Sequence, residues 1–135
     1  MIEITVTVIG ILAGVIGFLL TNFYFQPVLR YREIIDQVTS DLVFYANAIR
    51  AQGLNDEMRQ RVFDRMTANR RHSVDLAACF YRLPREYEWY LRRTGEDPAN
   101  ASIELMGFSN TDEFDAADIR MKKIQAYLGI KPPIV

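Results

Sequence analysis

The sequence predicts an all-α fold in which one N-terminal transmembrane helix is followed by a small helical bundle of about four to five helices. Residues 4–29 contain no charged side chain, whereas the rest of the chain is rich in charge. After this stretch the apolar residues recur at helical spacing, and no segment combines strand-like alternation with hairpin turn residues. We therefore expect a transmembrane anchor over residues 1–26 and one helical domain over residues 27–135.

The anchor is the uncharged segment from Ile4 to Phe25. As a helix, these 22 residues extend about 33 Å, enough to cross the roughly 30 Å hydrocarbon layer of a bilayer. A cleaved signal peptide is the alternative, but it would have a basic N-terminal region, a shorter apolar run and a small-residue cleavage site. The segment lacks these features, so the lipid bilayer is the first partner that the sequence predicts.

The charges that flank the anchor predict its orientation. Glu3 precedes it, whereas Arg30 and Arg32 follow it, and positively charged flanks remain on the cytoplasmic side. The aromatic residues 23–25 lie at the same end, where an interfacial belt is expected, and Pro27 marks a point at which the helix can kink or restart. We expect residues 1–3 outside and the C-terminal domain in the cytoplasm.

Three glycines, Gly10, Gly14 and Gly17, lie on one face of the predicted anchor. Because they carry no side chain, two such helices could approach each other closely there, and the chain could form a homo-oligomer. The alternative is that glycine is simply frequent in membrane helices. The glycine face is thus a hypothesis for self-association.

A seam of apolar residues follows the anchor at alternating intervals of three and four. Its members are Val28, Tyr31, Ile35, Val38, Leu42, Tyr45 and Ile49. This spacing predicts a long amphipathic helix that continues from the membrane and ends at Gly53. The seam could pack against later helices of the same chain or form a coiled coil with a second copy. We favour packing within the chain, because about three heptads are short for a coiled coil.

Capping residues divide the remaining chain into further helices. Asn55 is the expected N-cap of a helix that runs toward Leu83, although the polar stretch 69–72 leaves open a kink or two shorter helices. A third helix begins at Pro84 and ends at Gly95.

Two shorter helices complete the predicted bundle. One opens at Asp97 and Pro98 and is closed by Gly107, which follows its apolar residues. The last begins near Thr111, with acidic residues in its first turn, and ends at Gly129.

Residue types that carry chemistry are sparse. Cys79 is the single cysteine and His72 the single histidine, and no phosphate-binding loop, zinc motif or nucleophile motif occurs. The sequence thus predicts no enzyme, no cofactor and no metal. Tyr87, Trp89 and Tyr90 could form an interfacial anchor or a partner-binding patch, but aromatic residues at helical spacing are more often part of a core.

Charge is segregated along the predicted domain. Residues 50–93 carry ten Arg, and residues 94–119 carry seven acidic side chains and no basic one. One interpretation is a patch that binds an anionic ligand such as a lipid headgroup or a nucleotide. Its candidate residues are Arg59, Arg65, Arg70 and Arg71. We favour pairing within the fold, in which acids from residues 96–118 meet these arginines. Nucleic acid is not an expected partner, because interleaved acids leave the stretch only weakly positive.

Residues 44–47 (Phe-Tyr-Ala-Asn) and residues 107–110 (Gly-Phe-Ser-Asn), in this layout behind the anchor, resemble segments of a group of single-pass bacterial membrane proteins with a small cytoplasmic helical domain. The resemblance implies a bacterial inner membrane and lends no activity. We therefore predict a non-enzymatic, membrane-tethered module that binds a protein partner or itself. The alternative is a membrane-bound sensor or effector that holds an anionic ligand through its arginines.

Overall fold

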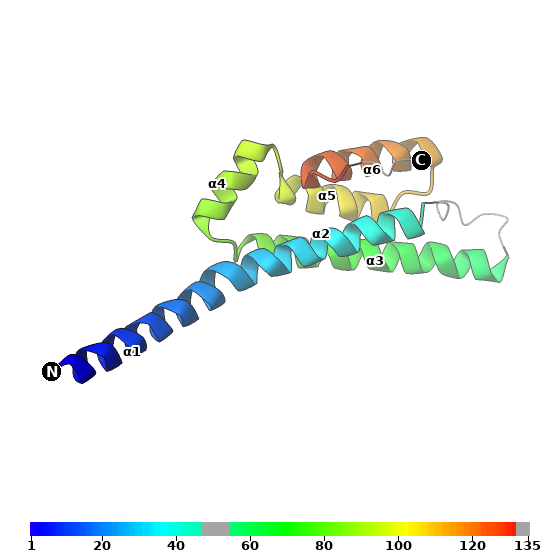
Figure 1. Ribbon diagram of the computed structural model, residues 1–135. Coiled ribbons are helices and arrows are strands. Elements are labelled where there is room, and N and C mark those ends of the chain that lie inside the picture. The colour runs from blue at the N-terminus through cyan, green and yellow to red at the C-terminus, as the bar shows by residue number, and fades with distance from the viewer. Residues whose placement is uncertain (47–54, 132–135) are drawn as a thin grey trace.

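The computed structural model describes residues 1–46 and 55–131, and within these ranges the protein is all-α, without a strand. The N-terminal helix consists of α1 (Ile2–Leu20), a π-helical turn η1 (Thr21–Phe25) and α2 (Gln26–Phe44). The remaining helices are α3 (Asp56–Phe80), α4 (Arg85–Thr94), α5 (Pro98–Ser109) and α6 (Phe114–Leu128). Figure 1 shows α1 projecting away from a bundle that the other helices form. This architecture confirms the predicted fold class.

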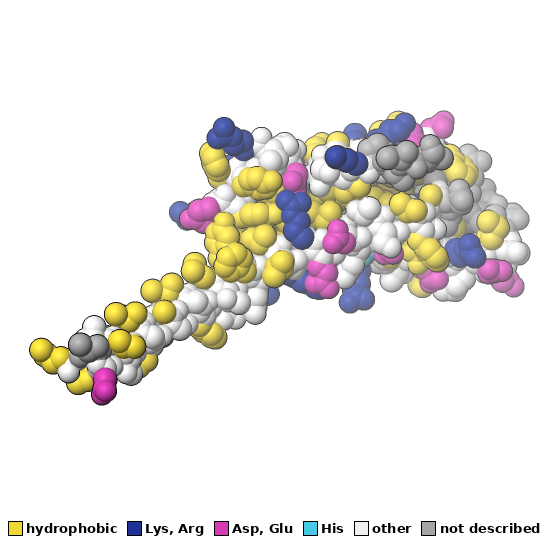
Figure 2. Space-filling model, viewed as in Figure 1, with side chains coloured by type: hydrophobic (Ala, Val, Ile, Leu, Met, Phe, Trp, Pro, Cys, Tyr) yellow, Lys and Arg dark blue, Asp and Glu magenta, His cyan; other side chains and the backbone are white. Residues whose placement is uncertain are grey.

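The first half of the N-terminal helix is apolar and lies free of the bundle. Among the described residues, this is the one helix that is long and apolar enough to cross a membrane, and none of its most apolar stretch is buried inside the protein. Apolar side chains are distributed along the projecting helix in Figure 2, whereas the basic and acidic ones gather on the bundle, apart from one acidic side chain near the tip of the helix. This stretch therefore turns its apolar side chains outward and could cross a membrane.

The π-helical turn stands directly before Pro27. The backbone N–H of Gln26 donates to the carbonyl oxygen of Thr21, five residues earlier. Proline has no N–H to donate, and its ring would clash with the carbonyl four residues before it, so a wider turn relieves the helix at this point. The helix changes direction here but does not stop (Figure 1).

α2 is the central helix of the core. Five of its side chains are buried, namely those of Tyr31, Ile34, Ile35, Val38 and Leu42. With Val28, which packs against them at the edge of the cluster, they confirm that the seam is core of the same chain as far as Leu42. α2 ends at Phe44 and not at Gly53, which lies outside the described residues, as does Ile49.

α3 is one unbroken helix of 25 residues, without the kink that its polar middle allowed. Asn55 caps it as expected, because its Oδ1 accepts from the backbone N–H of Met58 at 2.9 Å. The polar residues do not break the helix since they find partners inside the bundle. His72 Nε2 lies 2.7 Å from Oδ2 of Asp41 in α2, and Ser73 Oγ donates to the carbonyl of Ser102 in α5 at 2.7 Å.

The predicted boundary between α4 and α5 is confirmed. α4 ends at Gly95, whose φ of +83° is a conformation that favours glycine. Asp97 then accepts from the backbone N–H of Asn100 at 3.1 Å and so caps α5.

The predicted end of α5 at Gly107 is wrong, because the helix continues to Ser109. Glycine is required here by close packing, because a Cβ at position 107 would collide with the guanidinium of Arg120. This guanidinium passes over Gly107 and donates to Glu104 at 2.7 Å. α6 begins at Phe114, three residues later than Thr111, and ends at Gly129 with a φ of +64°. The core is completed by Leu105, Phe108, Ile124 and Leu128.

Candidate functional site

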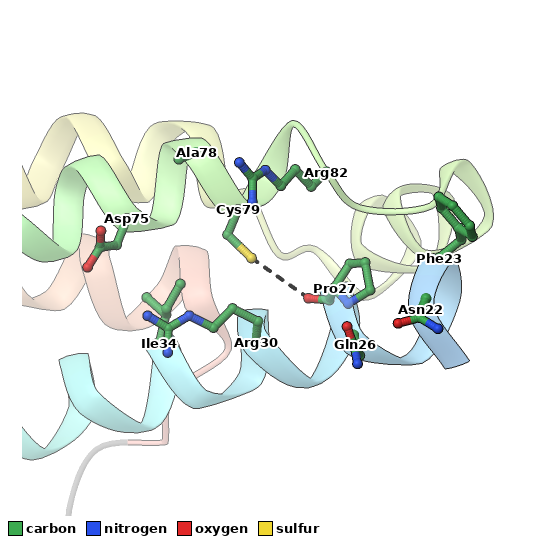
Figure 3. A pocket seen from close by; sticks show the side chains of 10 residues that line it. All are labelled: Asn22, Phe23, Gln26, Pro27, Arg30, Ile34, Asp75, Ala78, Cys79 and Arg82. Carbon is green, nitrogen blue, oxygen red and sulfur yellow. Dashed lines mark hydrogen bonds between the residues drawn. The ribbon is translucent and has the colours of Figure 1, made fainter. Parts of the chain in front are cut away.

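A groove of about 660 Å³ lies where the N-terminal helix passes the C-terminal end of α3. Figure 3 shows the side chains that line it, which come from two walls. One wall consists of Asn22, Phe23, Gln26, Pro27, Arg30 and Ile34. The other consists of Asp75, Ala78, Cys79 and Arg82. The groove thus begins at the last turn of the apolar segment and extends along the first turns of α2.

The groove carries two arginines and one carboxylate. Arg30 Nη1 is 2.7 Å from Oε2 of Glu33, but both side chains are more than half exposed, at 52% and 56%, so this ion pair is weak. Asp75 lies 3.7 Å from Arg71. Arg82 is exposed and has no ion pair within the described part of the chain. The guanidinium groups of Arg30 and Arg82 therefore line this groove without a strong ion pair.

Cys79 lines the groove and is only 6% exposed. Its Sγ–H donates to the carbonyl of Pro27 at 3.7 Å. Burial raises the pKa of this thiol, and the nearby charges of Arg30 and Arg82 oppose that change. A thiol that remains protonated is a poor nucleophile.

His72 lies in a different hollow and does not meet Cys79. That hollow, of about 600 Å³, is formed by α2 and the first half of α3, and the histidine is held there by Asp41. A cysteine and a histidine seven residues apart on one helix are about 10 Å apart along its axis. The described residues also contain no group of three His, Cys, Asp or Glu side chains that could hold a metal ion.

The four candidate arginines do not converge on one site. Arg65 is buried, at 1% exposed, where Nη2 donates to the carbonyl of Thr111 at 2.8 Å and the guanidinium lies 5.1 Å from the centre of the Phe108 ring. Arg70 Nη2 donates to Oδ1 of Asn110 at 2.8 Å. Arg71 borders the second hollow, and Arg59 is exposed near the start of α3.

No ion pair joins these arginines to the acidic segment within the described residues, although the charge of Asp112 opposes the lowering of the Arg65 pKa by burial. Glu96 pairs with Arg32 of α2 at 3.6 Å, and Glu104 pairs with Arg120 and Lys123 of α6 at 2.7 and 3.2 Å. Glu96 and Glu104 are thus paired within the fold, with cations from α2 and α6 instead of α3.

Glu96 joins α2 to the segment between α4 and α5. Tyr31 Oη donates to its Oε2 at 3.2 Å, and Arg32, which approaches Glu96, donates from Nε to Tyr87 Oη at 2.7 Å. Burial raises the pKa of Tyr31, and the adjacent Glu96 carboxylate raises it further. These contacts fix the end of the bundle that lies nearest α1, where Figure 1 also places α4.

The aromatic residues of α4 are only partly core, so the preferred interpretation of the sequence is wrong for two of them. Tyr87 is half-buried and its ring lies edge-on to that of Tyr31, 6.0 Å between centroids. Trp89 and Tyr90 are 61% and 46% exposed. The guanidinium of Arg93 lies over the Trp89 ring at 5.3 Å. α4 therefore presents an amphipathic aromatic surface beside the groove end of the bundle.

The three anchor glycines are exposed on α1. A Cβ built on Gly10, Gly14 or Gly17 would have no atom within 4 Å. Nothing in the single chain requires glycine at these positions, and self-association through this face stays a prediction.

Sequence reasoning missed the groove residues because they come from two segments about fifty residues apart. The available signal was the polar pair Asn22 and Gln26, one turn apart at the end of an otherwise apolar segment.

Comparisons with known proteins found no match to this chain among family models, curated proteins or solved structures.

Proposed function

We propose that this chain is a non-enzymatic, single-pass protein of a bacterial inner membrane whose helical bundle binds a protein partner, or a second copy of itself, at the cytoplasmic face. One observation carries the proposal: the anchor and the central core helix are the same helix. It is apolar and unburied as far as Leu20 and supplies five buried side chains beyond Gln26. A bundle built on its own anchor is held at a fixed place on the membrane.

The linkage between the two parts is stiff. A flexible tether would let the bundle sample many positions, whereas a continuous helix that is clamped at Tyr31 and Arg32 fixes its height and orientation. Fixed presentation of a surface suits a binding partner that is itself in or on the membrane, because it raises the effective concentration of the two surfaces.

The outer face of α3 is the surface that we propose for the partner. It presents Phe63, Thr67, Arg70 and Val74 at intervals of four and three, and all four are exposed. Phe63 is 62% and Val74 is 60% exposed, and Ile103 of the neighbouring α5 is 65% exposed. Phe63 and Val74 lie on the same face of α3, about 16 Å apart along the helix axis, and exposed apolar side chains on a helix face are typical of surfaces that bind another helix.

Two observations argue against catalysis. The buried thiol of Cys79 has a raised pKa, and His72 is paired with Asp41 in a separate hollow. The sensor alternative loses support as well, since Arg59, Arg65, Arg70 and Arg71 do not line a common pocket.

The orientation has a direct test. Glu3 on one side and Arg30 and Arg32 on the other support a cytoplasmic bundle. Fusions of alkaline phosphatase and green fluorescent protein after Val135 should give an inactive phosphatase and a fluorescent reporter. An active phosphatase with a dark fluorescent protein would reverse the orientation.

Photo-crosslinking in intact membranes tests the binding surface. A photoreactive amino acid at Phe63 or Val74 should give a crosslinked product heavier than the monomer, and mass spectrometry of the band identifies a second copy or another protein. The same probe at Lys122, an exposed position on α6, is the matched control. Equal crosslinking at all three positions, or none at either α3 position, would overturn the proposed surface.

A further inference from the structure

We infer that the groove between the N-terminal helix and α3 binds the phosphate headgroup of an anionic membrane phospholipid, with Arg30 and Arg82 as its ligands. This inference rests on the proposed membrane placement and orientation of the anchor. It assigns the anionic-ligand role to a pair of arginines different from the four that the sequence suggested.

The depth of the groove matches the headgroup layer. The apolar segment ends at Phe25, and the groove is lined from Asn22 to Ile34. Headgroups add about 5–7 Å to each side of the hydrocarbon layer. Arg30 lies five residues beyond Phe25, which is about 7.5 Å along the helix axis, so its side chain is within reach of lipid phosphates.

The chemistry of the two walls suits a phosphodiester. Guanidinium groups donate two parallel hydrogen bonds to phosphate oxygens, and here Arg30 comes from α2 while Arg82 comes from the turn after α3. Asp75 contributes one negative charge, so the lining keeps a net positive charge that favours an anionic over a zwitterionic headgroup. Asn22 and Gln26 add amide groups at the hydrocarbon end of the groove.

Neither arginine is committed to a strong partner. Arg30 would exchange an exposed ion pair with Glu33 for a phosphate, and exposed ion pairs contribute little to stability. Arg82 has no ion pair within the described part of the chain. The groove volume of about 660 Å³ is in the range of small-molecule sites.

The surroundings of the groove suit a membrane interface. Tyr81, which precedes Arg82, is 86% exposed. Trp89 is 61% exposed and belongs to α4, the helix that Figure 1 places at the end of the bundle nearest α1. Phe23, on the groove wall, is 71% exposed at the end of the apolar segment. Tryptophan and tyrosine are enriched at the level of lipid headgroups, where an apolar ring and a polar atom are both satisfied.

The test is native mass spectrometry of the full chain, delipidated in detergent and titrated with dioleoyl phosphatidylglycerol, dioleoyl phosphatidylcholine or inorganic phosphate. We expect one phosphatidylglycerol per chain, bound at least about tenfold more tightly than phosphatidylcholine. Arg30→Gln and Arg82→Gln should each weaken phosphatidylglycerol about tenfold or more, since each removes a charge-assisted hydrogen bond. Arg59→Gln removes the same charge from an exposed site at the far end of α3 and should bind as wild type.

Each other outcome overturns the inference. Unchanged binding in Arg30→Gln and Arg82→Gln would exclude the groove, and an equal loss in Arg59→Gln would reduce the effect to net charge. Inorganic phosphate that binds as tightly as the lipid would make the site one for free phosphate. Circular dichroism of each variant verifies the fold, and Arg82→Lys, which keeps the charge, should retain part of the affinity. The fusion reporters test the membrane placement separately, so a cytoplasmic bundle without lipid selectivity would refute this inference alone.

Discussion

α1 and α2 are two halves of one helix, each of 19 residues, yet they meet different surroundings. α1 is apolar on all sides and no described side chain in it is buried, whereas α2 is apolar along one stripe and buries five side chains. Both segments are α-helical, so their backbones do not account for the difference. The distribution of apolar side chains around the helix axis does, because a stripe suits a protein core and an all-round apolar surface suits lipid. Substitutions in the two halves should therefore differ in their effect on the stability of the bundle.

A charge placed in the α2 stripe should unfold the bundle. Leu42 is 4% exposed and belongs to the core cluster. Leu42→Asp removes a buried side chain and leaves an unpaired carboxylate there, which we expect to cost more than about 4 kcal/mol and to abolish the cooperative thermal transition. Circular dichroism of the detergent-solubilised chain measures it.

The neighbouring Val43 is the matched control. It is 56% exposed on the same helix, so Val43→Asp should change the unfolding free energy by no more than about 0.5 kcal/mol. If Leu42→Asp kept a cooperative transition and only reduced a crosslinked dimer, the stripe would serve an intermolecular contact instead of the core.

Substitution of the buried Arg65 should cause the second largest loss of unfolding free energy. Burial lowers the pKa of Arg65, and its Nε and Nη1 have no hydrogen-bond partner in the described contacts. Arg65→Ala leaves a cavity and should cost about 2–4 kcal/mol. Arg65→Met fills the space without a buried charge and should stay within about 1 kcal/mol of wild type.

Chemical denaturation of both variants measures the difference. Equal losses in Arg65→Ala and Arg65→Met would mean that the hydrogen bond to Thr111, and not the volume of the side chain, holds the turn between α5 and α6.

The sequence sufficed for the helices and most of their caps, because those depend on local spacing and on residues such as Asn55, Asp97 and Gly95. It failed where a partner lies far along the chain. His72 looked like a break in α3, although Asp41 pairs with it across the bundle, and Gly107 looked like a helix end, although Arg120 occupies its space. The groove was missed for the same reason, since periodicity along one helix does not reveal which helix it faces.

Tyr31, near the anchor end of α2, should make the unfolding free energy depend on pH in the alkaline range. Burial and Glu96 raise the pKa of Tyr31 above the value of about 10 expected in the unfolded chain. The neutral phenol is therefore favoured by folding, and its contribution is fully present below pH 10 and is lost as the pH rises further. The unfolding free energy should fall by about 1.4 kcal/mol per pH unit above 10.

Tyr31→Phe should reduce this slope, measured by urea denaturation between pH 9 and pH 11. Tyr81→Phe, which removes the hydroxyl of an 86% exposed side chain, is the control and should keep the wild-type slope. An unchanged slope in Tyr31→Phe would assign the alkaline loss to another group.

The smallest effect on the bundle, and the sharpest test of α1, comes from the glycine face. Gly14→Ile adds a side chain that meets no atom within the chain, so the bundle should keep its wild-type thermal transition. If two anchors pack through Gly10, Gly14 and Gly17, the added bulk separates them. A cysteine introduced by Glu3→Cys allows dimers in native membranes to be trapped as disulfides by oxidation. Adding Gly14→Ile to this chain should lower the yield of disulfide-linked dimer roughly tenfold, equivalent to about 1.4 kcal/mol. Cys79 does not compete because it is buried. Leu12→Phe adds bulk on the opposite side of the helix, about 140–160° from the three glycines, and should leave the dimer intact. Equal dimer in all variants would show that the glycine face does not mediate self-association.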